Sequence, residues 1–424
     1  MEQLKRELRF VDVAAIGLNG VIGTGIFFLP GEIADLLGPA SILCFLISAV
    51  LCTLLALCFA EVGSRFTGTG GPMLYSRAAF GETAGFLVGW ITWFVRISSW
   101  AALANGLVRA TDSLLPGVAD YRIGALFLIF ASLSAANWRG VSLGAKVTNF
   151  FTVAKLLPLI IFIAIGVFYI DGSRFSPFAP HGMKPIADGT LLIFYAFVGF
   201  EVLVVPAAEM RNPARSIPLA LACVIVVATA IYIAVWAVCT GTLETLAGSK
   251  NPVIDASSTF LGSFGGKMIA LGVFLSVFGI NAGSALVSPR CLYALAQAGY
   301  FPRFIGWVHP TRGTPGVAII ITGTLAFGLA LSGTFEELAV ISIVGRFAQY
   351  IPTCLALPVL RHHKDVAKTN FRVPYGTAIS IASVVLCVWL LVASDPMKIM
   401  WGSIAMVSGL LIYWPYTFVR RKMQ

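Results

Sequence analysis

Charge is what this sequence has least of. Lys, Arg, Asp and Glu together make up 11% of its 424 residues, whereas soluble proteins carry about 25%. Apolar residues reach 58%, so too few polar side chains remain to cover the surface of a soluble protein. Despite a formal net charge of +10, the composition therefore argues against a soluble enzyme, a disordered chain and a nucleic-acid-binding protein.

Metal ligands are also few. The chain has 4 His and 8 Cys, no CxxC motif occurs, and the cysteines lie within or at the ends of apolar stretches. Small buried thiols in a reduced protein account for this pattern, and we expect neither a metal site nor a cofactor. Because the sequence also lacks a nucleophile–base set and a phosphate-binding loop, it does not predict an enzyme.

Long apolar runs stand where the charges are missing. A helix needs about 20 mostly apolar residues to cross a bilayer, and such runs recur along the chain. They are too long for the alternating strands of a membrane barrel, and no link between them could hold a separate domain. We predict one all-α integral membrane domain over 1–424. Its twelve transmembrane helices are expected at 11–36, 40–63, 85–111, 123–137, 147–170, 188–208, 217–241, 266–294, 315–333, 336–360, 376–394 and 397–418.

The positions of the cations predict the orientation, because Lys and Arg accumulate in cytoplasmic loops. With the N-terminus placed in the cytoplasm, the inner segments hold 19 of these residues and the outer segments hold 7. This asymmetry also supports an even number of spans. We therefore predict a multi-pass protein of the plasma (inner) membrane with both termini cytoplasmic.

The first span is rich in glycine. Gly17, Gly20, Gly23 and Gly25 fall within nine positions, which weakens any helix. A close-packing face would explain Gly20 and Gly23, but adjacent positions such as Gly23 and Thr24 do not share a face, so we favour an unwound stretch. Unwound backbone is tolerated in lipid only where it lines a cavity or is buried in protein. Its free amides can hold an anion and its free carbonyls a cation, and an amino acid zwitterion presents both.

The sixth span contains a second break signal. Gly199 lies near its middle and Pro206 near its end. Spans one and six are five apart and therefore start from opposite sides of the membrane. Two inverted five-helix repeats with binding at the broken helices match this spacing. We place the first repeat at 1–170 and the second at 171–360, and helices eleven and twelve at 361–424.

Three cations and one acid lie deep within the predicted spans. They are Arg96, Lys155, Arg346 and Glu201. A charge in hydrocarbon is costly unless it is paired or faces water, so each is a functional candidate. Arg96 either pairs with Glu201, binds a helix carbonyl or contacts the substrate directly. Arg346 fits a scaffold or gate role. Glu201 is either a buried acid that links moving helices or a satisfied carboxyl that holds helix six to a neighbour.

Five sequence motifs follow one another in a specific order. They are the glycine-rich 22–27, the loop motif at 70–77, the sixth-span stretch at 197–201, the Glu-x-x-Asn-Pro-x-Arg-x-Ile-Pro motif at 209–218, and the Arg-to-Pro motif at 290–302. This ordered set covers nearly the whole chain and resembles the amino acid–polyamine–organocation superfamily of transporters.

The resemblance implies a fold and a binding site. The fold is the leucine-transporter type, with ten helices in two inverted repeats plus two more, helices one and six broken, and transport by alternating access. The substrate carboxylate would meet backbone amides of helix one, and the ammonium would meet carbonyls of helices one and six. Tyr195 would also gate the substrate. The implied substrate-binding positions are Ile22, Gly23, Thr24, Gly25, Ile26, Tyr195, Ala196 and Val198.

The resemblance also suggests a role for Lys155. Relatives that do not use sodium carry a helix-five lysine whose ammonium takes the place of the ion between helices one and eight. The expected contacts are the backbone near Gly17 and the hydroxyl of Ser284. The amine either loses its proton and couples transport to protons or stays charged and braces the helices. A structural lysine that reaches toward water is the plainer alternative.

These observations together predict a secondary active amino acid transporter. We expect it to be sodium-independent and either proton-coupled or exchanging, with an amino acid, the lipid bilayer and, on the first alternative, protons as its partners. Neutral substrates are favoured because no acid beyond Glu201 lies deep enough to meet a cationic side chain. An exchanger of cationic amino acids or polyamines is the alternative within the family, and a channel is the alternative from another class. The oligomeric state stays open.

Overall fold

The computed structural model of the chain describes residues 4–23, 25–115, 117–333, 335–363, 366–367, 369, 371–392, 400, 408–411 and 413. Within these residues the regular elements are helices, and the only strand-like feature is an isolated bridge between Leu8 and Met210. Seven helical stretches among them are long and apolar enough to cross a membrane. The predicted all-α class is therefore confirmed for these residues and is consistent with a membrane protein, whereas the twelve spans and the two inverted repeats stay predictions.

The helices follow the apolar runs of the sequence. They are α1 Phe10–Val21, α2 Gly25–Leu37, α3 Ile42–Gly63, α4 Pro72–Phe80, α5 Glu82–Leu114, α6 Arg122–Trp138, α7 Val141–Gly166, α8 Ile186–Phe197, α9 Pro213–Thr242, α10 Pro252–Gln297, α11 Gly316–Ser332, α12 Phe335–His362 and α13 Gly376–Val392. The last predicted span, 397–418, lies mostly outside the described residues.

Two helical segments differ from the expectation. The link at 72–80 forms α4, which begins with Pro72, a residue that suits the first turn of a helix. Helix α10 begins at Pro252 instead of 266 and bends at Gly262, where φ is +62°. Hydropathy alone missed both, because a short interfacial helix and a kinked helix start do not need a long apolar run.

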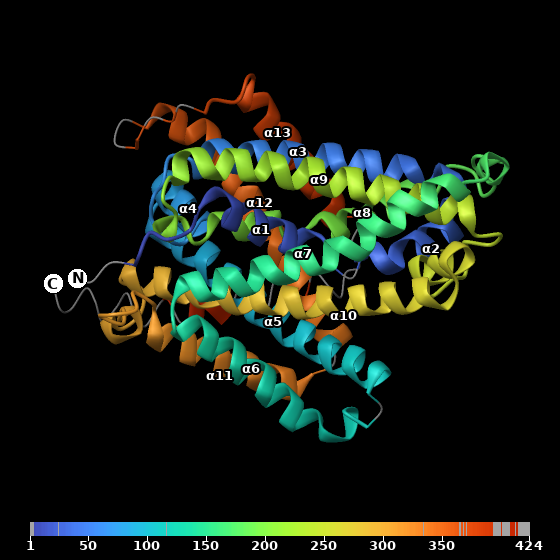
Figure 1. Cartoon of the computed structure of the whole chain (residues 1–424). Helices are drawn as coiled ribbons and strands as arrows, with labels where there is room; N and C mark the ends of the chain where they lie inside the picture. Colours follow the sequence, from blue (N-terminus) through green and yellow to red (C-terminus); the bar gives the residue numbers. More distant parts are fainter. Residues whose placement is uncertain are drawn as a thin grey trace.

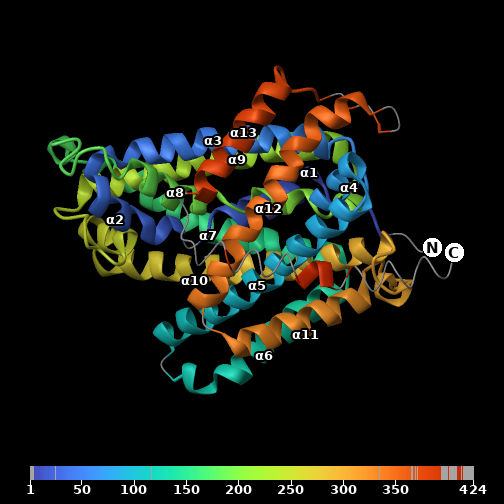
Figure 2. The same ribbon diagram turned by 180° about the vertical axis from the view of Figure 1, so that it is seen from behind.

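Helices α3, α7, α9 and α10 run roughly along one axis of the molecule (Figure 1), and α12 runs across that axis (Figure 2). Helices α7 and α10 lie side by side, as do α3 and α9, and α6 pairs with α11 at one edge (Figures 1 and 2). Helix α1 lies inside this arrangement and contacts α7, α9 and α10. The glycine-rich first span is thus buried in protein, as its unwound backbone requires.

Both predicted interruptions are present. Helix α1 ends at Val21 and α2 begins at Gly25, whereas α8 ends at Phe197 and gives way to the short 3₁₀ helix η5, Phe200–Val204. Gly199 sits between them with φ +123°, a conformation that side chains disfavour.

The two breaks touch backbone to backbone. A Cβ atom on Gly20 would lie 2.7 Å from the carbonyl oxygen of Gly199, and one on Gly199 would collide with the Gly20 carbonyl. Glycine at both positions therefore lets the end of α1 meet the break between α8 and η5. These two elements make up the sixth predicted span, which we call helix six.

Candidate functional site

Lys155 on α7 caps the broken end of α1. Its side chain is fully buried, and its Nζ donates to the carbonyl oxygen of Asn19 at 2.9 Å and to that of Ile22. The last carbonyls of a helix have no partner inside it and carry partial negative charge. An ammonium placed there is stabilised by two charge-assisted hydrogen bonds.

Lys155 was expected to contact the helix-one backbone near Gly17 and the hydroxyl of Ser284; its bonds reach that backbone at Asn19 and Ile22, and the contact with Ser284 stays a prediction. Ile22 N–H donates to the Leu18 carbonyl at 2.9 Å, so the carbonyls outside the helical pattern begin only at Asn19. Gly17 instead packs tightly against side chains of η5 and α9. The α10 hydroxyl nearest this end is that of Ser276, 3.5 Å from the Ile22 carbonyl oxygen. The expected role of Lys155 as a substitute for an ion stays a prediction.

Further polar contacts hold α1 between α7 and α10. The Asn19 amide donates to the Gly279 carbonyl of α10 at 2.5 Å, and the Thr152 hydroxyl of α7 lies 3.3 Å from the Ala15 carbonyl. Lys155 therefore lies where three helices meet, and its two hydrogen bonds depend on the position of the end of α1.

Tyr232 on α9 joins the two breaks, and sequence reasoning missed it. Its buried hydroxyl lies 2.8 Å from the Val21 carbonyl oxygen and 2.9 Å from that of Ala196. A hydroxyl has one proton, so it donates to one of these carbonyls at a time. A lone tyrosine in the middle of an apolar span was the only sequence signal for this role.

The start of α2 faces the end of α8. A Cβ on Gly25 would lie 3.2 Å from the Cβ of Ala196, and Ile26 follows as a buried residue. The first N–H groups of a helix have no partner inside it and favour an anion. The predicted carboxylate position at Gly25 and Ile26 thus has the right polarity, and Thr24 lies outside the described residues.

The carbonyls expected to meet the substrate ammonium already accept bonds. Ile22 accepts from Lys155, Ala196 is within reach of Tyr232, and Tyr195 accepts from the N–H of Val198 at 3.3 Å. Each carbonyl oxygen keeps a second lone pair that can accept a hydrogen bond from a substrate ammonium. The contact with the substrate stays a prediction. Tyr195 as a whole residue is 39% exposed although its span is largely buried, which leaves it open to an approaching molecule.

Glu201 forms the second charged centre, at the start of η5. One carboxylate oxygen accepts from Arg96 Nη2 at 3.1 Å and Arg346 Nη1 at 2.7 Å. The other accepts from the Gly199 N–H at 3.0 Å and the Tyr350 hydroxyl at 2.8 Å. The side chain of Glu201 is fully buried.

This centre answers a question that the sequence left open. Arg96 pairs with Glu201, which was the first of the alternatives for it. Arg346 joins the same carboxylate and also reaches the Ser99 hydroxyl at 3.4 Å. Two guanidinium groups therefore share one carboxylate, and the centre ties α5 and α12 to the break in helix six.

The N-terminal segment is bound to the loop after η5. Leu8 N–H donates to the Glu209 carbonyl at 2.9 Å, and Arg211 N–H donates to the Leu8 carbonyl at 3.0 Å. Glu209 and Arg290 of α10 form a fully buried bidentate pair, with Nη2 and Oε1 2.7 Å apart. Sequence motifs contain these acids and bases, but nothing in the spacing showed that they pair.

Metal-binding geometry is not seen among the residues that the structure describes. No group of three or more His, Cys, Asp or Glu side chains comes together there in a way that could hold an ion.

Comparison with known proteins identifies the family. The family model described as amino acid permease matches residues 8–414. The chain is 28% identical to the methylthioribose transporter of Bacillus subtilis (strain 168) over 98% of its own length and 94% of that protein. It is 27% identical to the branched-chain amino acid permease BcaP of the same organism, with the same shares covered. It is 30% identical to the cationic amino acid transporter 4 of Mus musculus over 85% of this chain and 60% of that protein.

The apolar helices and the family match define a multi-pass membrane transport protein. The chain belongs to the amino acid permease family, within the amino acid–polyamine–organocation group that its motifs resemble. This is a family of membrane transporters, not of enzymes.

Proposed function

We propose that the chain is a sodium-independent secondary active transporter of amino acids that works by alternating access. The observation that carries the proposal is the Lys155 ammonium, buried between α1, α7 and α10 and bonded to the free carbonyls of Asn19 and Ile22. A fixed cation at the broken helix end makes a bound metal cation unnecessary for neutralising those carbonyls. Movement of the end of α1 must break these two bonds, which couples the lysine to the transport cycle.

Neutral amino acids fit the buried charges best. Arg96, Lys155 and Arg346 outnumber the single deep acid, and Glu201 already accepts four hydrogen bonds. A cationic substrate side chain would find no free carboxylate among the described residues of these helices. The similarity to a branched-chain amino acid permease supports a neutral substrate.

A cationic amino acid exchanger is the second candidate. The observation in its favour is the 30% identity to a cationic amino acid transporter. The excess of buried positive charge opposes it, because like charges repel in a site of low polarity.

The topology of the proposal follows the sequence pattern. We propose twelve spans with both termini in the cytoplasm, an inverted pair of five-helix repeats over 1–170 and 171–360, and two further helices in 361–424. The positive-inside pattern and the paired helix breaks support this arrangement. Cysteine accessibility at positions in the links 139–140 and 167–185, before and after α7, would test it, since the proposal puts these links on opposite sides.

The decisive experiment is counterflow into proteoliposomes. Vesicles loaded with leucine, serine, lysine, putrescine or methylthioribose are supplied with the same radiolabelled compound, in sodium or in potassium buffer and with or without a pH gradient. We expect saturable uptake of a neutral amino acid that is equal in sodium and potassium. Accumulation of the substrate inside the vesicles when a pH gradient is applied indicates proton coupling. Uptake that occurs only when the vesicles already contain substrate indicates exchange. A requirement for sodium, or no response to any amino acid, contradicts the proposal.

A further inference from the structure

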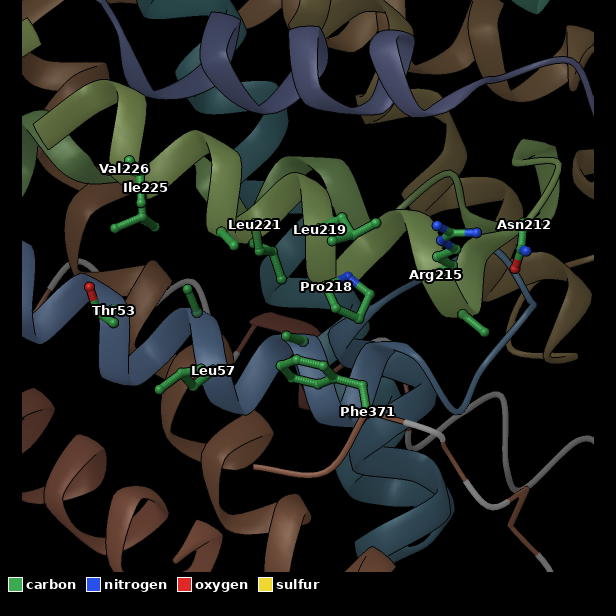
Figure 3. Close-up of a pocket in the computed structure, with 14 residues that line it drawn as sticks. Thr53, Leu57, Asn212, Arg215, Pro218, Leu219, Leu221, Ile225, Val226 and Phe371 are labelled. Atoms are coloured by element: carbon green, nitrogen blue, oxygen red, sulfur yellow. The ribbon is translucent and has the colours of Figure 1, made fainter. Parts of the chain in front are cut away.

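A groove runs along the outer side of α3 and α9, away from both helix breaks. Its volume is about 640 Å³, and most of its lining is apolar (Figure 3). Small residues on both helices leave the space open, among them Ala56 and Ala60 on α3 and Ala214 and Ala222 on α9. Phe371, from the segment before α13, also lines the groove. Because α3 and α9 are both apolar enough to cross a membrane, an apolar groove between them would face hydrocarbon in a bilayer.

One end of the groove is positively charged. Arg215 and Asn212 lie at that end and Val226 and Thr53 lie toward the other (Figure 3). Arg215 is exposed, and none of the ion pairs among the described residues involves it. It belongs to the first turn of α9, where the helix itself carries partial positive charge. This end attracts an anion.

The length of the groove matches a lipid chain. From Asn212 to Val226 the rise along α9 is roughly 21 Å at 1.5 Å per residue. The hydrocarbon of one leaflet is about 15 Å deep. An acyl chain would fill the apolar part and leave its headgroup level with Arg215. A peptide would have to bury its polar backbone against the apolar wall, which is costly.

We propose that the groove between α3 and α9 binds an anionic phospholipid, with one acyl chain between the helices and the phosphate at Arg215. The lipid belongs to the leaflet on the side of the N-terminal segment, because Leu8 pairs with Met210 just before α9 begins. The opposite side of α9 faces the helix breaks. There the Tyr232 hydroxyl contacts the Val21 carbonyl oxygen, and Val224 packs against Gly17. The lipid thus stabilises the outer side of the helix that holds the breaks. Its binding does not depend on which substrate is transported.

The test compares two lipids that differ only in headgroup charge. Full-length protein in detergent is titrated with dioleoyl phosphatidylglycerol or dioleoyl phosphatidylcholine, and bound lipid is counted by native mass spectrometry. One cation near a membrane surface contributes about a fivefold preference for anionic lipid, so Arg215→Gln should reduce the preference of the wild-type protein by about that factor. Arg139→Gln is the matched control, because Arg139 is also exposed and lies on the same side as the N-terminal segment. The carbonyl of its neighbour Trp138 accepts from Thr314, and Lys5 donates to the Thr311 carbonyl close by.

A second variant tests the acyl chain separately. Ala222→Trp places a large ring in the groove at an exposed position and should reduce binding of both lipids. A phosphatidylglycerol with a photoreactive acyl chain should label peptides of α3 and α9, which gives an answer even if Ala222→Trp folds poorly. Inorganic phosphate should not displace the lipid. Equal retention of both lipids by wild-type protein, an unchanged preference in Arg215→Gln, or labelling confined to other helices would overturn the proposal.

Discussion

The two helix breaks hold opposite charges in different ways. At the end of α1, Lys155 donates to two backbone carbonyls and has no carboxylate partner among the described residues. At the start of η5, Glu201 accepts four hydrogen bonds, three of them from side chains of α5 and α12. Lys155 contributes two bonds at the α1 break, whereas Glu201 ties three elements together. On the proposed alternating-access mechanism, we therefore expect Lys155 to affect movement of α1 and Glu201 to affect the stability of the helix-six break.

Removing the acid should have the largest effect. Glu201→Ala leaves two guanidinium groups buried without a counter-charge, and breaking a buried pair in this way costs about 3–5 kcal/mol. We expect a large fall in the melting temperature of the purified protein, measured by intrinsic fluorescence. Glu244→Ala is the control, because Glu244 is exposed. An unchanged melting temperature for Glu201→Ala would show that the helix-six break is not anchored by this carboxylate.

Removing the cation should affect transport more than stability. Lys155→Met deletes two charge-assisted hydrogen bonds, and a change of about 2 kcal/mol corresponds to a fall of roughly 30-fold in counterflow rate. The melting temperature should fall less than in Glu201→Ala. Lys146→Met, on an exposed position of the same helix, should transport normally. If Lys155→Met transports like wild type, the contrast between the two breaks fails.

The charge of the lysine can be separated from its proton. Lys155→Arg keeps a cation that does not deprotonate in proteins. If Lys155 only braces the helices, the variant should retain most exchange and an unchanged pH profile. If Lys155 carries the coupling proton, the variant should still exchange but should no longer concentrate substrate when a pH gradient is applied. Uptake assays with and without the gradient distinguish the two.

The bridge between the breaks should have an intermediate effect. Tyr232→Phe removes one hydroxyl that serves two carbonyls, a loss of about 1 kcal/mol or roughly fivefold in transport rate. Tyr169→Phe, a change of the same type on an exposed residue, serves as the control. A rate equal to that of wild type would mean that the Val21 and Ala196 carbonyls do not need the bridge.

The smallest effects are expected at two serines of α10, Ser276 and Ser284. The Ser276 hydroxyl is as far as 3.5 Å from the Ile22 carbonyl oxygen, and the bonds of Lys155 seen among the described residues go to Asn19 and Ile22. Alanine at either position should change stability by about 0.5 kcal/mol, the low end of what one hydrogen bond contributes. A large loss of transport in Ser284→Ala with none in Ser276→Ala would restore the contact inferred from the family resemblance.

Much of the candidate site could be predicted because its signals are local. The glycines at 17–25 indicated the break in α1, Gly199 indicated the break in helix six, and both occur where expected. Arg96 and Glu201 were singled out as deep charges, and they form a pair. Burial of a charge is readable from hydropathy, since a single ionised residue interrupts an apolar run.

The partners of these residues were harder to predict. Lys155 was expected at the backbone near Gly17 and at Ser284, and its bonds go to the carbonyls of Asn19 and Ile22. Adjacent positions on a helix point about 100° apart, so an error of one or two residues in where α1 ends moves every free carbonyl to a different direction. Tyr232 escaped notice for a related reason, because the sequence shows that it is buried but not that both broken ends lie beside it.

The sequence by itself determined that this protein is an all-helical membrane protein, where its helices break, and which charges lie deep. Those properties depend on hydrophobic runs and on residues a few positions apart. Only the tertiary structure decided that Lys155 caps α1, that Arg346 and Arg96 share Glu201, and that α3 and α9 leave a groove ending at Arg215. Each of these depends on how helices far apart in the chain are rotated against one another, and that rotation is set by packing across the whole molecule.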